Sequence, residues 1–291
     1  MIGDKQIGTR IFNIINATLL TILALIMILP FIHVLGSSFA TGAEIAEKRF
    51  LLFPTKFTLS AYKYIFSTDT VMKSVMVSIF VTVAGTLWSM FLSTLTAYGL
   101  SRRDLVGRRY IMFFIIFTML FNGGIIPTFI VVQQTGLLDS LAALIIPVSI
   151  NVFNMIILKT FFQNLPYGLE ESAKIDGAND FGILFRIIIP CSLPAIATIS
   201  LFYAVTYWNT YMHAILYLSD AGKWPVQVLL RQIVVLATGM NYDSAEFTDV
   251  PPPSQSVKMA VIVVATVPVL LVYPFLQKHF AKGALLGSIK E

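Results

Sequence analysis

The chain has 291 residues, of which 57% are hydrophobic and only 12% are charged, with a net charge of +5. Soluble proteins carry about 25% charged residues, and a surface this apolar would be insoluble, so the composition predicts an all-α polytopic membrane protein. The basic residues stand in short blocks beside apolar runs, which is typical of membrane topology signals and argues against nucleic-acid binding. The single cysteine, Cys191, excludes an intrachain disulfide.

Six apolar segments are predicted to cross the bilayer, whose hydrocarbon core is about 30 Å thick. The first contains Pro30, which we expect to bend or end that helix. The stretch from Tyr110 to Leu158 would be about 70 Å long as one helix, so we expect the chain to reverse at residues 133–139. We expect one transmembrane domain over residues 1–291, with spans at about 11–35, 74–100, 110–132, 140–159, 193–218 and 259–276.

The distribution of lysine and arginine predicts the orientation. Basic residues precede the first span and follow the second and sixth spans, so the positive-inside rule predicts cytoplasmic termini. The segment from Pro225 to Leu236 is apolar but short and contains Arg231, so we expect an external helix, with a re-entrant segment as the alternative. The basic residues concerned are Lys5, Arg10, Arg102, Arg103, Arg108, Arg109, Lys278, Lys282 and Lys290.

The most polar stretch of the chain, residues 169–180, lies between the fourth and fifth spans. Its five charged residues would together cost roughly 12 kcal/mol or more at mid-bilayer, so this stretch is expected in cytoplasmic water. They are Glu170, Glu171, Lys174, Asp176 and Asp180.

Two short helices meeting at a corner are predicted within this polar loop, which we define as residues 164–190. Pro166 suits the first turn of a helix, and an i,i+4 pair is expected between Glu170 and Lys174. Gly177 can adopt the left-handed conformation that ends a helix. Asn179 is a suitable N-cap for the next helix, which we expect to continue through Pro190 into the fifth span.

The motif in this loop resembles the EAA loop of ABC importer permeases. That pattern is Glu-Ala-Ala, three residues, Gly, nine residues, Ile, any residue, and Leu-Pro; the chain has Glu171-Ser172-Ala173, Gly177 and Ile187-Ile188-Ile189-Pro190. Ser172 replaces the first Ala and Ile189 replaces Leu. Four further segments resemble the carbohydrate-importer branch of this family. They are Leu165-Pro166, Ile175-Asp176-Gly177-Ala178, Phe53-Pro54 through Tyr62, and Tyr207-Trp208-Asn209.

The resemblance covers nearly the whole chain and implies a type I ABC importer permease. It implies as partners a cytoplasmic ATPase dimer, a second homologous permease, an extracytoplasmic solute-binding protein and an oligosaccharide substrate, in a bacterial plasma membrane. No Gly-x-x-x-x-Gly-Lys-Ser/Thr loop occurs, so the chain is expected to be no enzyme, with ATP and Mg on the partner ATPase. The coupling residues implied are Glu170, Glu171, Ala173, Asp176, Gly177, Ala178 and Pro190.

A candidate substrate path lies in the fifth span. On a helical wheel its polar and aromatic residues form one arc opposite an apolar arc, which predicts one face against a cavity; interhelical hydrogen bonds with the partner permease remain the alternative. Trp208 falls on the apolar side, where we expect it to pack. The path residues are Tyr203, Thr206, Tyr207, Thr210 and Tyr211, with Asn209 at the edge.

Polar residues of the third and fourth spans are further candidates for this path. Asn122 is followed by two glycines and Pro127, which weaken the helix and can free carbonyl groups toward a cavity. Asn151 and Asn154 share one helical face and could line the same cavity or join helices. In the second span a stripe of small residues predicts close helix packing; it comprises Thr82, Thr86, Ser89, Ser93 and Thr96.

Other functions have weaker support in the sequence. No catalytic set or metal site is expected, because the three histidines lie in separate segments. An ion-coupled secondary transporter needs a buried carboxylate, whereas every carboxylate here falls in a loop or at a span end. The resemblance to ABC importer permeases implies that the loops at residues 44–73 and 239–256 could receive a substrate-binding protein. The substrate is expected to be a neutral or mildly charged oligosaccharide, with acidic glycans left open.

Overall fold

The computed structural model describes residues 7–48, 50–237 and 255–288, and every regular element within these ranges is helical. The predicted all-α class is therefore confirmed. The described chain divides into two compact units: residues 1–69 with 230–266, and residues 70–229 with 267–291. Each unit is described separately below.

The first unit begins with α1 (Ile7–Ser38), a long apolar helix whose side chains are exposed from residue 8 to residue 31. Of the two expectations for Pro30, a bend or an end of the helix, the end does not occur: the helix continues for two more turns. One missing backbone hydrogen bond is tolerated in an apolar helix of this length. The end of α1 is held by the chain that follows it: Ser38 Oγ lies 2.8 Å from Tyr62 Oη, and His33 Nδ1 lies 2.9 Å from Leu51 O.

A carboxylate organises the loop after α1, which contains α2 (Gly42–Glu47) and α3 (Ser60–Ser67). Glu44 is largely buried and accepts hydrogen bonds from Thr55 N at 2.7 Å, Lys56 N at 3.4 Å and Lys48 Nζ at 3.2 Å. These bonds, those from Thr55 foremost, lower the pKa of Glu44 to about 2. The sequence analysis did not predict this folded loop, since its contacts join residues eleven or twelve positions apart.

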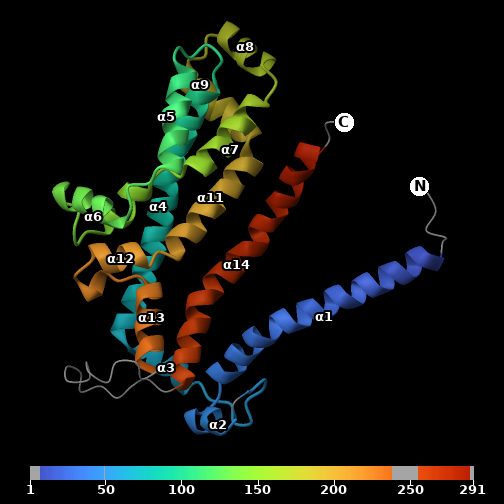
Figure 1. The fold of residues 1–291 in the computed structure, drawn as a ribbon, viewed down its shortest axis with the longest axis vertical. Coiled ribbons are helices and arrows are strands. Elements are labelled where there is room, and N and C mark those ends of the chain that lie inside the picture. Colours follow the sequence, from blue (N-terminus) through green and yellow to red (C-terminus); the bar gives the residue numbers. More distant parts are fainter. Residues whose placement is uncertain (1–6, 49, 238–254, 289–291) are drawn as a thin grey trace. The chain divides into compact units, whose positions relative to one another are not determined.

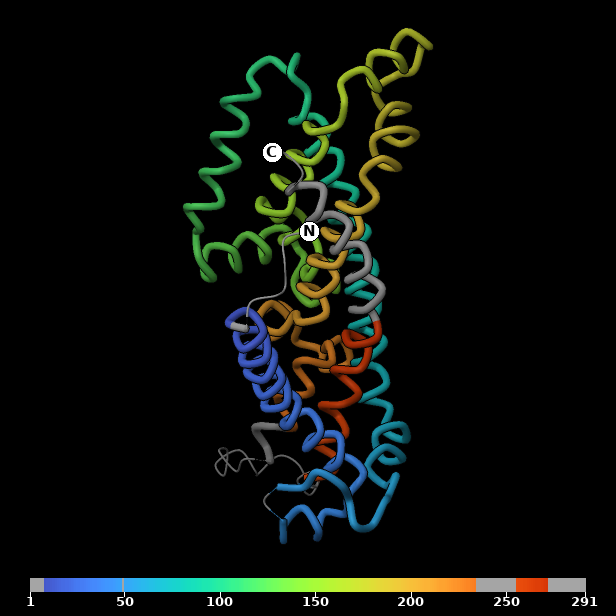
Figure 2. The backbone as a smooth tube through the Cα atoms, turned by 90° about the vertical axis from the view of Figure 1, so that its right-hand side faces the viewer, coloured from blue at the N-terminus to red at the C-terminus, as the bar shows by residue number. Residues whose placement is uncertain are grey.

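The central helix of the second unit is α4 (Asp69–Ser101). It is one unbroken helix and contains the whole of the expected second span. The helix α11 (Leu193–Trp208) runs beside it (Figures 1 and 2). Ser89 Oγ and Ser93 Oγ lie 2.7 and 2.6 Å from the hydroxyls of Tyr207 and Tyr203. Close packing by the small-residue stripe is thus confirmed at these two serines. It is extended by Gly85, where an added Cβ would lie 2.8 Å from the Tyr207 ring.

Two of the expected spans, the third and the fourth, are broken helices. The helices α5 (Arg108–Leu120) and α6 (Ile125–Gln134) meet at 114°, where Gly124 adopts a φ of +88° and Asn122 Oδ1 accepts a hydrogen bond from Gly124 N. The 3-10 turns η1 (Leu141–Leu144) and η2 (Ile146–Val148) meet α7 (Val152–Gln163) at 52°. The predicted weakening of the third span around Asn122 is therefore confirmed as a complete break.

The expected fifth span also consists of separate helices. The helix α11 ends at Trp208, and α12 (Met212–Tyr217) follows after a gap. Asn209 Nδ2 donates to Val205 O at 2.8 Å, so this side chain competes with the backbone for the last carbonyls of α11. The helical wheel used above therefore does not extend to Tyr211.

The reversal expected at residues 133–139 is confirmed by Gly136 and Asp139, whose φ angles are +71° and +55°. The segment that follows α12 contains η4 (Ala221–Lys223) and α13 (Val226–Ala237), so the helix expected near residues 225–236 is confirmed as a helix.

Two described helices are long and apolar enough to cross a membrane alone, and up to five spans result if each bent pair is one span. The sixth expected span lies within α14 (Gln255–Ser288). The number of six spans remains a prediction.

Candidate functional site

The polar loop forms the predicted corner of two short helices at the end of α4 that carries Ser101 (Figure 1). Its first helix, α8 (Gly168–Ile175), has acidic residues in the first turn and Lys174 in the last turn, which suits the helix dipole. Gly177 has a φ of +80°, Gly177 N donates to Lys174 O, and Ala178 N donates to Ala173 O. This pair of bonds is a Schellman motif, so the prediction that Gly177 ends this helix in a left-handed conformation is confirmed. Pro166 lies two residues before the helix rather than within its first turn.

The second helix of the corner, α9 (Asp180–Ile183), begins as predicted at Asn179. Its side chain accepts a hydrogen bond from Gly182 N at 2.7 Å. The helical path continues through a π-helical turn, η3 (Leu184–Ile188), and α10 (Ile189–Cys191). The expectation that it runs directly into the fifth span is wrong, because the chain bends by 86° before α11. The bend lies between Pro190 and Pro194, which cannot donate backbone hydrogen bonds.

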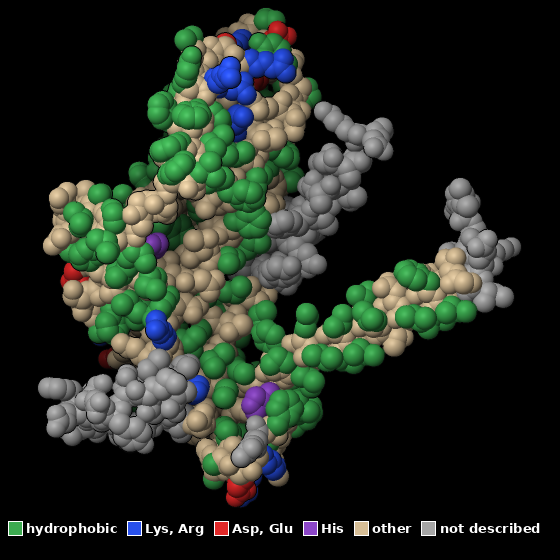
Figure 3. Space-filling model, in the orientation of Figure 1, with side chains coloured by type: hydrophobic (Ala, Val, Ile, Leu, Met, Phe, Trp, Pro, Cys, Tyr) green, Lys and Arg blue, Asp and Glu red, His purple; other side chains and the backbone are tan. Residues whose placement is uncertain are grey.

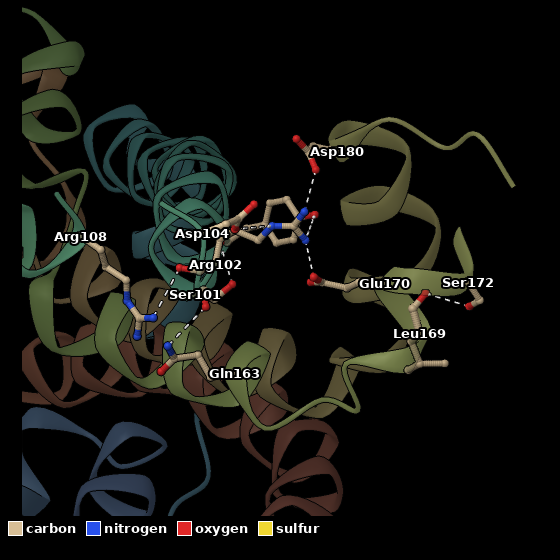
Figure 4. Close-up of polar contacts among 10 residues, drawn as sticks. Ser101, Arg102, Asp104, Arg108, Gln163, Leu169, Glu170, Ser172 and Asp180 are labelled. Carbon is tan, nitrogen blue, oxygen red and sulfur yellow. Dashed lines mark hydrogen bonds and ion pairs between the residues drawn. The ribbon is translucent and has the colours of Figure 1, made fainter. Parts of the chain in front are cut away.

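Arg102 is the centre of the charge network in this loop (Figure 4). Its Nη1 contacts Glu170 Oε2, and its Nη2 lies 2.8 Å from Asp180 Oδ1. The predicted pair of Glu170 with Lys174 is therefore wrong in this structure, since Glu170 points back to the end of α4. Tyr98 completes the site, with its hydroxyl 3.0 Å from Arg102 Nη1 and its ring centroid 5.1 Å from Cζ.

The outer face of the corner is both polar and apolar. Glu171, Asp176 and Gly177 are exposed, and so is the Ile175 side chain, at 86%. Ala173, by contrast, is buried in the hydrophobic core of this chain. The methyl group of Ala173 therefore packs inward; Ala178 is half-buried and Pro190 is exposed.

An open cleft of about 970 Å³ borders the corner on the side of α4. Its walls include Tyr98 and Arg102 from the end of α4, Val106 from the following loop, and Phe181 from α9. Val106 and Phe181 are exposed at 93% and 64%. Basic side chains gather around this end of the second unit (Figure 3), as the predicted cytoplasmic side requires.

The predicted substrate-path residues fall into two groups. Tyr203 and Tyr207 are buried at 2% and 1% exposure and bind the serines of α4. Tyr203 Oη also accepts a hydrogen bond from Asn151 N at 2.9 Å. The alternative left open by the sequence was hydrogen bonding with the partner permease, whereas these bonds form within this chain.

The remaining path residues lie nearer the surface or cap helices. Thr206 and Asn209 are exposed near the end of α11, and Asn209 Oδ1 lies 3.4 Å from Gln227 Nε2. Asn122 is exposed at the break between α5 and α6. The structure thus brings Asn151 to Tyr203. Of the rest, Thr210 and Asn154 are buried, Tyr211 is half-buried, and Trp208 is buried as predicted.

An ion-pair cluster that was not predicted from the sequence joins two distant loops. Lys223 Nζ lies 2.8 Å from Asp139 Oδ2, and Asp139 Oδ1 accepts hydrogen bonds from Ser219 N and Asp220 N. The hydrogen bond from Lys223 lowers the pKa of Asp139. Asp139 is the only charged residue between Tyr110 and Leu158, and this isolation was the available signal.

Comparison with known proteins gives the family. Residues 85–285 match the family described as "Binding-protein-dependent transport system inner membrane component", and the chain belongs to it. The predicted resemblance to ABC importer permeases, and the prediction that the chain is a transport component and no enzyme, are thereby confirmed. Of the expected receptor loops for a binding protein, residues 239–254 lie outside the described residues.

Three relatives illustrate this membership. The chain is 67% identical to the polygalacturonan/rhamnogalacturonan transport system permease protein YtcP of Bacillus subtilis, over 97% of this chain and 99% of the relative. It is 31% identical to the diacetylchitobiose uptake system permease protein NgcG of Streptomyces coelicolor, over 97% and 90%. A solved bacterial ABC transporter involved in import of the acidic polysaccharide alginate matches with a TM-score of 0.87 and 36% identity, over 96% of this chain and 99% of that chain.

Proposed function

We propose that this chain is the permease subunit of an ATP-driven importer for acidic oligosaccharides. Coupling of this chain to an ATPase is supported by one observation. The polar loop forms a corner with an exposed face, next to the basic end of α4. A corner held by two caps and an arginine can transmit force, because its helices cannot rotate independently.

The loop is proposed to dock on a cytoplasmic ATPase through its outer face. Glu171 is exposed and has no ion pair among the described residues, so it can pair with a basic residue of that subunit. Ile175 and Phe181 offer apolar surface on the same corner. ATP and Mg are assigned to the ATPase dimer, since this chain has no phosphate-binding loop.

The further partners follow from the same proposal. A second homologous permease completes the pathway as a heterodimer, and an extracytoplasmic binding protein delivers the substrate. The chain is proposed to cross a bacterial plasma membrane several times with both termini in the cytoplasm. Transport by alternating access requires the permease to change between two conformations. Shifting their populations from about 1:99 to 99:1 needs roughly 5.5 kcal/mol, which a nucleotide-driven motor can supply.

The acidic class of substrate is favoured by two relatives. One is named for polygalacturonan and rhamnogalacturonan, and another imports the acidic polysaccharide alginate; galacturonan and alginate are both built from sugars that carry carboxylates. The exposed polar residues near the end of α11, Thr206 and Asn209, together with Asn122, are proposed to contact the sugar hydroxyls.

Uptake by proteoliposomes tests this function. The complete complex, with both permeases, the ATPase and the binding protein, should import labelled galacturonate oligomers only when MgATP is supplied on the ATPase side. A neutral maltooligosaccharide of equal length should be imported poorly. Uptake driven by an ion gradient without ATP would instead identify an ion-coupled secondary transporter.

A further inference from the structure

A single arginine ties both helices of the polar loop to the end of a membrane-crossing helix. Arg102 follows the last residue of α4 directly, and its side chain is only 11% exposed. One planar group therefore reaches Glu170 in α8 and Asp180 at the start of α9, as Figure 4 shows. The two carboxylates flank the Schellman turn at Gly177, so the guanidinium spans the corner from one side to the other.

The geometry is specific to an arginine. A guanidinium offers several N–H groups in a rigid fork, so it can donate to two carboxylates and a hydroxyl at once, whereas a lysine is a point charge on a flexible stem. The stacked ring of Tyr98, 5.1 Å from Cζ, limits the positions that the guanidinium can adopt. Arg108 contributes from the other side by donating to Arg102 O at 3.4 Å.

The contacts of α4 extend this connection into the membrane part of the chain. Ser93 and Ser89 on the same helix bind Tyr203 and Tyr207 of α11. A displacement of the corner that is passed to Arg102 therefore acts on a helix that is bonded to α11.

We propose that Arg102 is a positioning residue for energy coupling: it locks the polar loop to α4, so that movement of the loop moves the helix pair α4 and α11. This inference rests on the proposed function, because it assumes that an ATPase moves the loop. Without the arginine the loop can still dock, but it swings on the chain segments at its ends.

The ratio of ATP hydrolysed to substrate imported, measured with the reconstituted complete complex, tests this role. Arg102→Gln should leave the ATPase bound and raise the ratio about tenfold or more, since a charged hydrogen bond lost here corresponds to at least that shift between held and released loops. Arg102→Lys should restore little of the coupling. Arg103→Gln is the matched control, because this neighbour is exposed, and it should keep the wild-type ratio.

A double-mutant comparison separates the lock from a general effect on charge. If Arg102 acts through Glu170, the variant Arg102→Gln/Glu170→Gln should be no worse than Arg102→Gln alone. Additive losses, or a wild-type ratio in Arg102→Gln, would overturn the inference.

Mobility of the loop gives a second measurement that does not depend on transport. A spin label at Ile175→Cys, in a Cys191→Ser background, should become more mobile with Arg102→Gln but not with Arg103→Gln. Equal mobility in both would also contradict the lock. Failure of the proposed function is distinguishable, because then the wild-type chain itself would neither retain the ATPase nor import with ATP.

Discussion

The hydroxyl of Tyr203 lies 2.6 Å from Ser93 Oγ, and this contact joins α11 to α4 across 110 positions of sequence. The same hydroxyl accepts the backbone N–H of Asn151, the N-cap residue of α7. One phenolic oxygen therefore links three helices.

Removing this hydroxyl tests its contribution to stability. Tyr203→Phe should lower the free energy of unfolding by about 1–3 kcal/mol, because it leaves the buried Ser93 hydroxyl without this partner and removes the acceptor of the Asn151 N–H. Thermal unfolding of the purified chain in detergent measures the change. Tyr110→Phe is the control, since Tyr110 is 73% exposed; equal effects of both substitutions would contradict the assignment.

The close approach of α4 and α11 can be tested at two glycines of one helix. Gly85→Ala places a methyl group 2.8 Å from the Tyr207 ring, and the resulting overpacking should cost about 1–3 kcal/mol. Gly99→Ala meets nothing within 4 Å and should be neutral or slightly stabilising, because alanine favours a helix over glycine. If both variants unfold alike, the packing described here is incorrect.

The corner of the polar loop gives a graded prediction at Gly177. Gly177→Asp should abolish uptake while the protein remains inserted in the membrane. Gly177→Ala should also be impaired, because a φ of +80° costs an alanine about 1–2 kcal/mol. Gly177→Asn separates backbone strain from contact with the partner, since asparagine tolerates this conformation.

Uptake restored by Gly177→Asn would mean that the turn alone matters. Loss of uptake in all three variants would mean that a partner surface also needs the space at Gly177, which is empty within this chain. Gly168→Ala, at a position that is equally open but has an ordinary helical φ, serves as the control. Normal uptake in Gly177→Asp would contradict the coupling role.

The loop after α1 should lose stability in acid. The pKa of Glu44 is lowered to about 2 in the folded chain, whereas an unperturbed glutamate titrates near 4.3. A lowered folded-state pKa contributes stability that is complete above the unfolded value and is lost as the pH falls from about 4.3 toward 2. Hydrogen exchange over residues 42–58 should accelerate, relative to the intrinsic rate, across this window.

Glu44→Gln should remove this pH dependence, because the amide cannot be protonated in this range. Glu47→Gln, at an exposed position in the same helix, should retain it. An unchanged acid profile in Glu44→Gln would show that another group controls the loop.

Local features of the polar loop were predictable from sequence, whereas its charge network was not. Gly177 and Asn179 act within a few residues of their own positions, and their side chains restrict the backbone directly. The sequence predicted Lys174, at helical spacing, as the partner of Glu170. In the structure Glu170 pairs with Arg102, which is 68 positions away. A contact over this distance in sequence cannot be predicted from helical periodicity.

Of the helix breaks too, one was predictable from the sequence and another was not. The two glycines and Pro127 predicted the weak point of the helix beside Asn122. The end of α11 at Trp208 was not predicted, because it depends on Asn209 bonding its own helix, a choice that an apolar run does not reveal. The burial of Tyr203 was likewise unpredictable, since a polar arc on a wheel fits both a water-filled cavity and a serine-lined neighbour.

Chemical labelling of the corner tests the central claim most directly. A cysteine at Ile175, in a Cys191→Ser background, should react with an impermeant maleimide in inside-out vesicles after the ATPase has been stripped, and should be protected when the ATPase is added back. Intact cells should leave it unlabelled. Labelling from the outside of intact cells, or equal labelling with and without the ATPase, would contradict the account of this loop as the motor's docking site.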